Sequence, residues 1–98
     1  MSEVYTTGYW APKAGEEEAF VAAWTEFARW ASGMPGAGRL RLARNDADGN
    51  YVSFGRWEGI DAVRAWKGLP EFGERIARVQ QHVGRFSPAE LEVVATVG

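Results

Sequence analysis

An aspartate–glycine pair at residues 48–49 separates two short segments that each have the pattern of a β-strand. In the first segment, residues 39–45, Leu40 and Leu42 alternate with arginines. The second segment, residues 51–57, is rich in aromatic and β-branched residues. Because Asp-Gly favours the tight turn of a β-hairpin, the pattern predicts two adjacent antiparallel strands. The hairpin therefore restricts the chain to folds that contain an antiparallel sheet.

Two further strands are predicted near the ends of the chain. Residues 3–10 combine tyrosine, threonine, valine and tryptophan, and the segment stops before Pro12 and Gly15. Residues 87–97 carry an apolar residue at every second position from Leu91 onward, which is typical of a strand with one buried face.

Three helices are predicted between these strands. Residues 16–32 carry apolar residues at intervals of three and four, and three glutamates at the start suit the positive end of a helix dipole. A short helix is expected after Gly59, with its apolar residues at spacing three: Ile60, Val63 and Trp66. Another begins at Pro70 and is expected to place four apolar residues on one face: Phe72, Ile76, Val79 and Val83.

The order of these elements is strand, helix, strand, strand, two helices, strand. This order matches the ferredoxin-like α+β arrangement βαββααβ, in which one antiparallel sheet carries its helices on a single face. A length of 98 residues allows one modest core, so we expect a single domain over residues 1–98.

Both faces of the predicted sheet carry bulky side chains. In the first strand Val4, Thr6 and Trp10 fall on one side, and Tyr5, Thr7 and Tyr9 fall on the other: neither side is strongly polar. Helices cover only one face, and an exposed apolar patch is most simply covered by the same patch of a second copy. We therefore expect a homodimer joined through its sheet faces, with the last strand reaching the neighbour.

Charge and composition exclude several classes of partner. The formal net charge is −2 and the arginines are interspersed with glutamates, so no basic face is expected to attract nucleic acid or an anionic membrane. The chain contains no cysteine, which excludes disulfides and cysteine-ligated metals. The start lacks the pattern of a signal peptide and no segment is apolar enough to span a membrane, so the expected location is cytoplasmic.

Three segments together carry a resemblance to a known family: FGRWEGIDAVRAWKGLPEF (54–72), PKAGEEEAFVAAW (12–24) and SPAELEVVATV (87–97). A tryptophan closes the third strand, a second lies near the end of the short helix, and an aromatic residue follows the next helix-starting turn. This pattern resembles the antibiotic biosynthesis monooxygenase superfamily of dimeric α/β barrels. The resemblance implies a small cavity between helices and sheet, in which several relatives oxidise phenols or quinols with O2 and neither flavin nor metal.

Other relatives of that superfamily bind haem and open its ring. They typically carry an Asn on the first strand, a Trp on the short helix and a haem-ligating His four residues after the aromatic residue of the next helix. Trp66 matches the Trp, but the Asn position falls near Gly8 and the His position falls on Ile76. The resemblance therefore implies neither haem degradation nor a bound haem, and we expect no cofactor and no metal.

The expected substrate-binding residues are aromatic. Cofactor-free oxygenation needs a dry pocket, a way to deprotonate an electron-rich aromatic molecule and donors that stabilise its oxyanion. We expect the walls and rim of such a pocket to come from five residues: Trp24, Phe27, Trp66, Phe72 and Tyr51. The alternative is that aromatic residues at helical spacing are ordinary core.

Three polar side chains are candidates for catalysis. His82 is expected at the edge of the last helix, where an ordinary imidazole could act as a base near neutral pH. Tyr9 and Arg56 could donate hydrogen bonds to a phenolate, although strand residues of these types also serve packing and solubility. A single histidine cannot hold a metal by itself.

Two functions from different classes remain open on the sequence. The first is a small cofactor-independent monooxygenase that oxidises an aromatic phenol or quinol with O2. The second is a non-catalytic dimeric module that binds a small aromatic metabolite. The family resemblance favours the first by analogy, and the lack of a clear general base favours the second.

Overall fold

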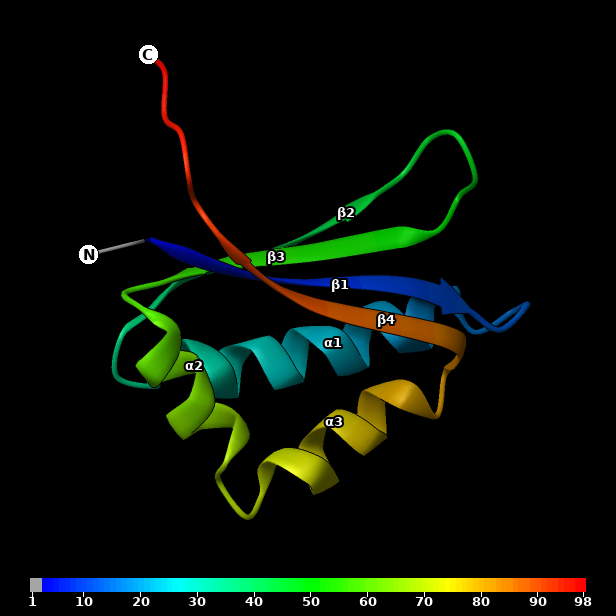
Figure 1. Cartoon of the computed structure of the whole chain (residues 1–98). Helices are drawn as coiled ribbons and strands as arrows, with labels where there is room; N and C mark the ends of the chain where they lie inside the picture. The colour runs from blue at the N-terminus through cyan, green and yellow to red at the C-terminus, as the bar shows by residue number, and fades with distance from the viewer. Residues whose placement is uncertain (1–2) are drawn as a thin grey trace.

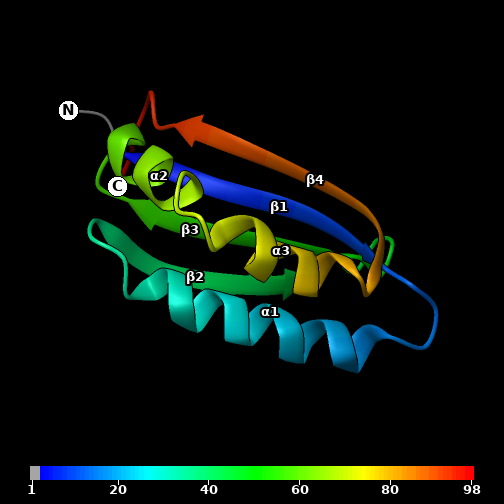
Figure 2. The same cartoon turned by 90° about the horizontal axis from the view of Figure 1, so that it is seen from below.

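A four-stranded antiparallel sheet with three helices on one face makes up the computed structural model, which describes residues 3–98 (Figures 1 and 2). The strands lie in the order β2-β3-β1-β4. The prediction of a ferredoxin-like βαββααβ fold is therefore confirmed. The elements are β1 (Val4–Pro12), α1 (Glu17–Ser32), β2 (Ala37–Arg44), β3 (Tyr51–Trp57), α2 (Ile60–Lys67), α3 (Phe72–Gln80) and β4 (Val83–Glu92).

The β2–β3 hairpin forms where the Asp-Gly pair predicts it. Gly49 has a φ of +75°, a left-handed conformation that glycine adopts without strain. The hairpin end is tied to β1, because the Tyr9 hydroxyl donates to the Asp48 carboxylate and receives a hydrogen bond of 2.9 Å from Asn50 Nδ2. The hydrogen bond from Tyr9, and after it the one from the Asn50 backbone N–H to Asp48 Oδ1, lower the pKa of Asp48 below its ordinary value.

The two faces of β1 differ in burial as the alternating pattern predicts. Val4, Thr6 and Trp10 are buried under the helices. Tyr5, Thr7 and Tyr9 lie on the opposite face and are partly exposed. Within one copy, residues 3–98 therefore provide no layer that covers the outer face of the sheet.

Trp57 lies at the centre of the core. It is fully buried, and its indole Nε1 donates a hydrogen bond of 3.0 Å to Thr6 Oγ1 on the neighbouring strand. The apolar stripe of α1 covers the same side of the sheet through Phe20, Trp24 and Phe27. The sheet register therefore fixes the large aromatic residues beneath the helices.

The last helix and last strand differ from the predicted bounds. The α3 helix ends at Gln80 and β4 begins at Val83, which pairs with Pro12, so Val83 does not extend the helix. The helical spacing of apolar residues was misleading at Val83, because a buried apolar residue suits both a helix face and the inner face of a strand.

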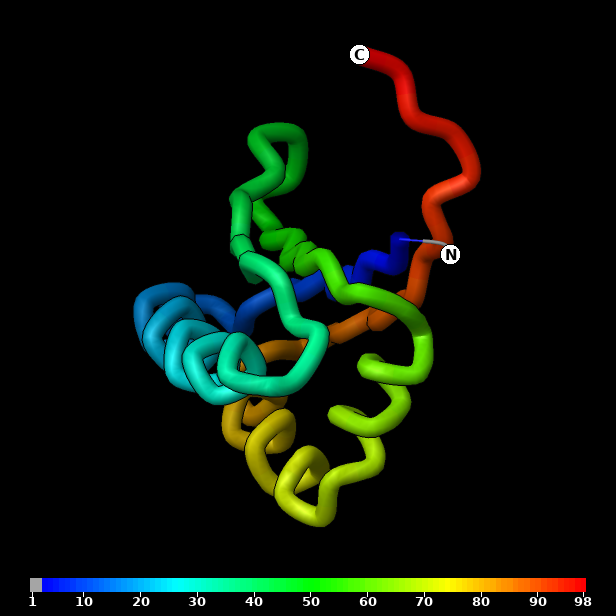
Figure 3. The backbone as a smooth tube through the Cα atoms, turned by 90° about the vertical axis from the view of Figure 1, so that its left-hand side faces the viewer, coloured from blue at the N-terminus to red at the C-terminus, as the bar shows by residue number. Residues whose placement is uncertain are grey.

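The end of β4 was also predicted wrongly. The strand ends at Glu92, whereas the alternating pattern continues to Val97. Residues 93–98 leave the sheet on its outer side, and Val94 and Val97 are 88% and 99% exposed (Figures 1 and 3). The Val93 N–H still donates to the Glu3 carbonyl, but alternation alone does not extend a strand where residues 3–98 offer it no further neighbour to pair with.

Candidate functional site

A cavity of about 160 Å³ lies between the inner face of the sheet and the three helices. Its walls come from every element of the fold, so residues distant in the sequence meet around it. Most of the lining is apolar, which is typical of small-molecule sites. Seven of the described lining residues are aromatic: Trp10, Trp24, Phe27, Phe54, Trp66, Phe72 and Phe86.

Trp66 is packed tightly against other aromatic rings. Its ring stacks on Trp57 with centroids 4.7 Å apart, and Phe72 meets it edge-on at 5.0 Å. Phe27 from α1 approaches it at 5.7 Å. Trp66 is therefore both part of the core and part of the cavity wall.

Two of the tryptophan N–H groups around the cavity have hydrogen-bond partners, and a third has none within the described residues. Ser53 Oγ accepts a bond of 3.0 Å from Trp10 Nε1, as Thr6 accepts one from Trp57. Trp66 Nε1 is buried and has no hydrogen-bond partner among residues 3–98. A buried donor without a partner is unusual and costs free energy.

Gly8 keeps the strand surface beneath the cavity free of side chains. A Cβ atom at this position would lie 2.7 Å from Trp10 Nε1 and 2.8 Å from Ser53 Oγ, so any larger residue would force Trp10 to move. Gly8 and Ile76 both line the cavity. The described lining residues include no histidine, cysteine, methionine or tyrosine, so they do not fit haem as its usual ligand set would require.

Two of the cavity-lining residues are exposed, Gln80 at the end of α3 and Pro88 on β4. We therefore place the mouth of the cavity on this side, between β4 and the helices. Lys67, at the end of α2, also lines the cavity, and its Nζ lies 2.8 Å from Glu90 Oε2 on β4. An ion pair therefore bridges the two sides of the mouth.

Four of the five predicted substrate-binding residues line this cavity: Trp24, Phe27, Trp66 and Phe72. Tyr51 also lies on the helix side of the sheet, but its ring packs 5.2 Å from Phe20 and lines a separate groove between α1 and β2. The structure thus brings together the aromatic residues of the three helices and leaves Tyr51 outside.

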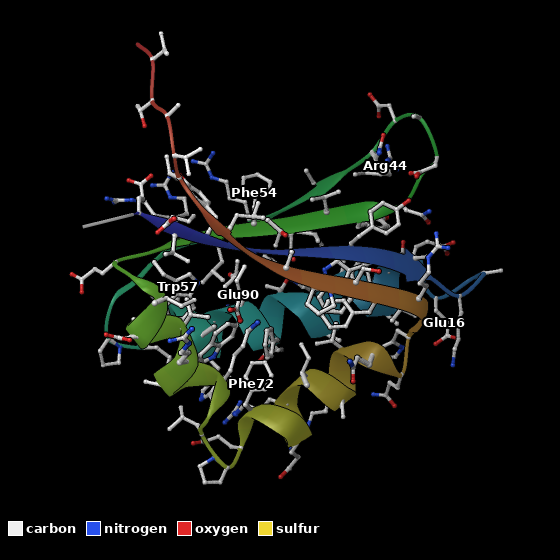
Figure 4. The ribbon with its side chains drawn as sticks, viewed as in Figure 1. Glu16, Arg44, Phe54, Trp57, Phe72 and Glu90 are labelled. Atoms are coloured by element: carbon white, nitrogen blue, oxygen red, sulfur yellow. The ribbon has the colours of Figure 1, made fainter. Side chains whose placement is uncertain are left out.

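The three predicted catalytic side chains lie outside the cavity. His82 is in the turn after α3, and its Nδ1 lies 3.0 Å from Glu16 Oε1 near the start of α1 (Figure 4 labels Glu16). Tyr9 is on the outer face, bound to Asp48. Arg56 is on the same face, with its Nε 2.8 Å from Glu3 Oε1. Within one copy, none of them contacts a molecule held among the aromatic walls.

Comparison with family models assigns most of the chain to a known group of proteins. Residues 4–78 match the model described as antibiotic biosynthesis monooxygenase. The chain belongs to this family. A comparison with curated proteins gave no match.

Several solved structures superimpose on nearly the whole chain. SnoaB, a cofactor-independent oxygenase from Streptomyces nogalater, is 21% identical, with a TM-score of 0.86 over 99% of this chain and 98% of SnoaB. Rv0793 from Mycobacterium tuberculosis is 18% identical, with a TM-score of 0.83 over 99% and 100%. PA3566 from Pseudomonas aeruginosa is 13% identical, with a TM-score of 0.79 over 97% of each chain. At such identities the likeness establishes the fold.

Sequence reasoning missed aromatic residues of the cavity, Trp10 and Phe86 among them, and its ionisable residue, Lys67. A signal for Lys67 was present, because it directly follows Trp66 near the end of the short helix. Its partner Glu90 is 23 positions away, and only the antiparallel pairing of β4 with β1 brings it to the cavity mouth.

Residues 3–98 contain no cluster of acidic or histidine side chains suited to a metal ion, and no helix in that range has the length and apolarity to cross a bilayer.

Proposed function

We propose that this chain is a cofactor-independent monooxygenase that oxidises a small phenol or hydroquinone with O2. The observation that carries the proposal is the apolar cavity, which is lined by aromatic side chains from all three helices. An aromatic wall binds a flat ring by stacking, and a ring oxygen that reaches the edge of the Trp66 indole would give the buried Nε1–H a partner. Family membership and the fold shared with SnoaB support the same reaction class.

The reaction needs no external reductant, because the phenol supplies all four electrons. One oxygen atom of O2 enters the ring, which becomes a quinone, and the other leaves as water with two hydrogens of the phenol. The protein's contribution is to hold the ring, exclude water and stabilise the phenolate oxygen while O2 accepts its first electron.

The cavity volume favours a small substrate. An engineered apolar cavity of roughly 150 Å³ is known to hold one benzene, and the present cavity of about 160 Å³ is similar in size. A single aromatic ring therefore fits between Trp66, Phe72 and the sheet, and any further ring would extend through the mouth between α3 and β4.

A second candidate function is a binding module without turnover. It is favoured by one observation: His82, Tyr9 and Arg56, the side chains expected to act on a substrate, lie away from the cavity. In this case the aromatic walls would bind the same small ring and leave it unchanged.

Oxygen consumption distinguishes the two functions. With a panel of one-ring phenols and hydroquinones, the wild-type protein is expected to consume O2 at a rate proportional to its concentration, with a metal chelator present and no flavin. One atom from isotopically labelled O2 should appear in the quinone. The Trp66→Ala variant, which loses a wall of the cavity, serves as the matched control. Uptake no faster than autoxidation across the panel would leave only the binding module.

We also propose that two copies associate through their outer sheet faces. The partly exposed Tyr5 and Phe54 lie on this face, together with Leu91, which pairs with Tyr5 and is 49% exposed. The β2–β3 hairpin and the C-terminal tail both rise from the sheet on this side, away from the helices (Figures 1 and 3). A second copy would cover the face and give the exposed valines of the tail a surface to contact.

The Leu91→Arg variant tests this association. The wild-type protein is expected to have the mass of two chains in light scattering at micromolar concentration, and the variant the mass of one, because each copy would bring a charge into an apolar interface. Val21→Arg is the matched control, since Val21 is also exposed but lies on α1, in the other layer. A monomeric wild-type protein, or a dimeric Leu91→Arg variant, would contradict the proposal.

A further inference from the structure

Lys67 gives the cavity its charge. Of the lining residues in the described chain, 3–98, it is the only one with an ionisable side chain. It lies beside Trp66 at the end of α2, and its side chain is 29% exposed. The Lys67 side chain therefore lines the cavity, and its ammonium group lies at the mouth, beside Glu90.

Glu90 holds Lys67 at the mouth when no ligand is bound. Glu90 pairs with Thr6 across β4 and β1, which places it on the helix side of the sheet, as Figure 4 shows. Its side chain is 36% exposed, and ion pairs this accessible to water add little net stability. A ligand anion can therefore replace the Glu90 carboxylate at low cost, because Glu90 can turn to solvent.

We infer that Lys67 is the anion-binding residue of the cavity, and that the ligand is a one-ring phenol bound as its phenolate. The ring lies against Trp66 and Phe72, and the oxygen faces the Lys67 ammonium group. This inference rests on the proposed function and adds the ionisation state of the substrate and the group that selects it.

The physical reason is that a nearby positive charge favours the ionised form of a phenol and lowers its pKa. The O–H bond breaks, the electron pair stays on the phenolate oxygen and the proton passes to water at the mouth. No buried general base is then required, which agrees with the position of His82 outside the cavity. The carboxylates that face this end, Glu58, Glu90 and Glu92, share a neighbouring groove and oppose the effect, so Lys67 must outweigh Glu90 in particular.

Binding of 4-nitrophenol tests the inference, because the visible absorption of its anion reports its ionisation directly. In the presence of excess wild-type protein, the pKa of the dye is expected to fall by about one unit or more. In Lys67→Met the shift should vanish and the affinity for the anion should fall about tenfold, whereas Lys67→Arg should retain both. Glu90→Gln should bind the anion more tightly. Lys13→Met, a change at the chain's other lysine, should behave as wild type.

A neutral ring of the same shape, 4-nitrotoluene, separates this inference from the proposed function. It is expected to bind wild type and Lys67→Met equally, which would also show that the variant keeps its cavity. If 4-nitrotoluene binds but the dye shows no pKa shift, or Lys67→Met binds the anion as tightly as wild type, the role of Lys67 is overturned and the aromatic cavity stands. If neither compound binds wild type, the proposed function itself is wrong.

Discussion

Replacement of Trp57 with alanine is expected to lower the free energy of unfolding by about 3 to 5 kcal/mol. Trp57 is fully buried, stacks on Trp66 at 4.7 Å and donates a hydrogen bond of 3.0 Å to Thr6. The substitution would leave a large void and a buried hydroxyl without its donor, and both effects are costly. A loss of this size is a large fraction of the total stability of a small domain.

Urea unfolding followed by circular dichroism measures this effect, at one protein concentration because association stabilises the folded state. Trp30→Ala is the matched control: Trp30 is also a tryptophan, but it lies on α1 and is only partly buried, with Arg75 stacked over its ring. Trp30→Ala is expected to lower the free energy of unfolding clearly less than Trp57→Ala. An unchanged unfolding midpoint for Trp57→Ala would contradict the assignment of Trp57 to the centre of the core.

The parts of the fold that the sequence predicts well are those set by local periodicity. The Asp48-Gly49 turn and the alternation around Leu40 and Leu42 correctly predict the hairpin of β2 and β3. The two faces of β1 also follow from alternation, because side chains on a strand must point to opposite sides. These features depend on neighbouring residues only, so no tertiary information is needed.

The ends of the last elements could not be predicted in the same way. Val83 continues the helical spacing of α3, yet the chain turns at Gln81 and Val83 instead pairs with Pro12 on β1. The position of a helix end depends here on where the neighbouring strand lies. The same limit applies to residues 93–98, whose alternation is that of a strand although the described chain offers them none to join.

In the candidate site, too, some residues could be predicted from local periodicity and others could not. Its aromatic walls were predictable because Trp24, Phe27, Trp66 and Phe72 lie on the apolar faces of helices that must cover the sheet. The polar residues were not, because their role depends on distances that the sequence does not contain. The candidate base, His82, lies beside Glu16, at a distance from the aromatic walls.

Replacement of Trp66 with alanine is expected to lower the affinity for a one-ring phenol by about 10- to 100-fold, which corresponds to roughly 1.4 to 2.8 kcal/mol. The ligand would lose a stacking surface and the indole donor together. The ligand-free protein should also lose about 2 to 4 kcal/mol of stability, since Trp66 is only 5% exposed and packs on Trp57. Isothermal titration calorimetry, performed well below the melting temperature of the variant, measures the affinity.

Trp66→Phe separates the stacking wall from the hydrogen-bond donor. Phenylalanine keeps an aromatic ring beside Phe72 and Trp57 but has no N–H, and in the ligand-free protein Trp66 Nε1 has no partner among residues 3–98 to lose. Removal of this unsatisfied donor relieves a desolvation cost and offsets part of the lost ring area, so Trp66→Phe should stay much closer to wild-type stability than Trp66→Ala. The affinity for a phenol should nevertheless fall several-fold, by the roughly 0.5 to 1.5 kcal/mol of one hydrogen bond. A small loss of stability in Trp66→Phe together with a clear loss of affinity for the phenol would show that the indole N–H donates to the ligand. Unchanged affinity in both Trp66→Phe and Trp66→Ala would show that Trp66 serves only in the core.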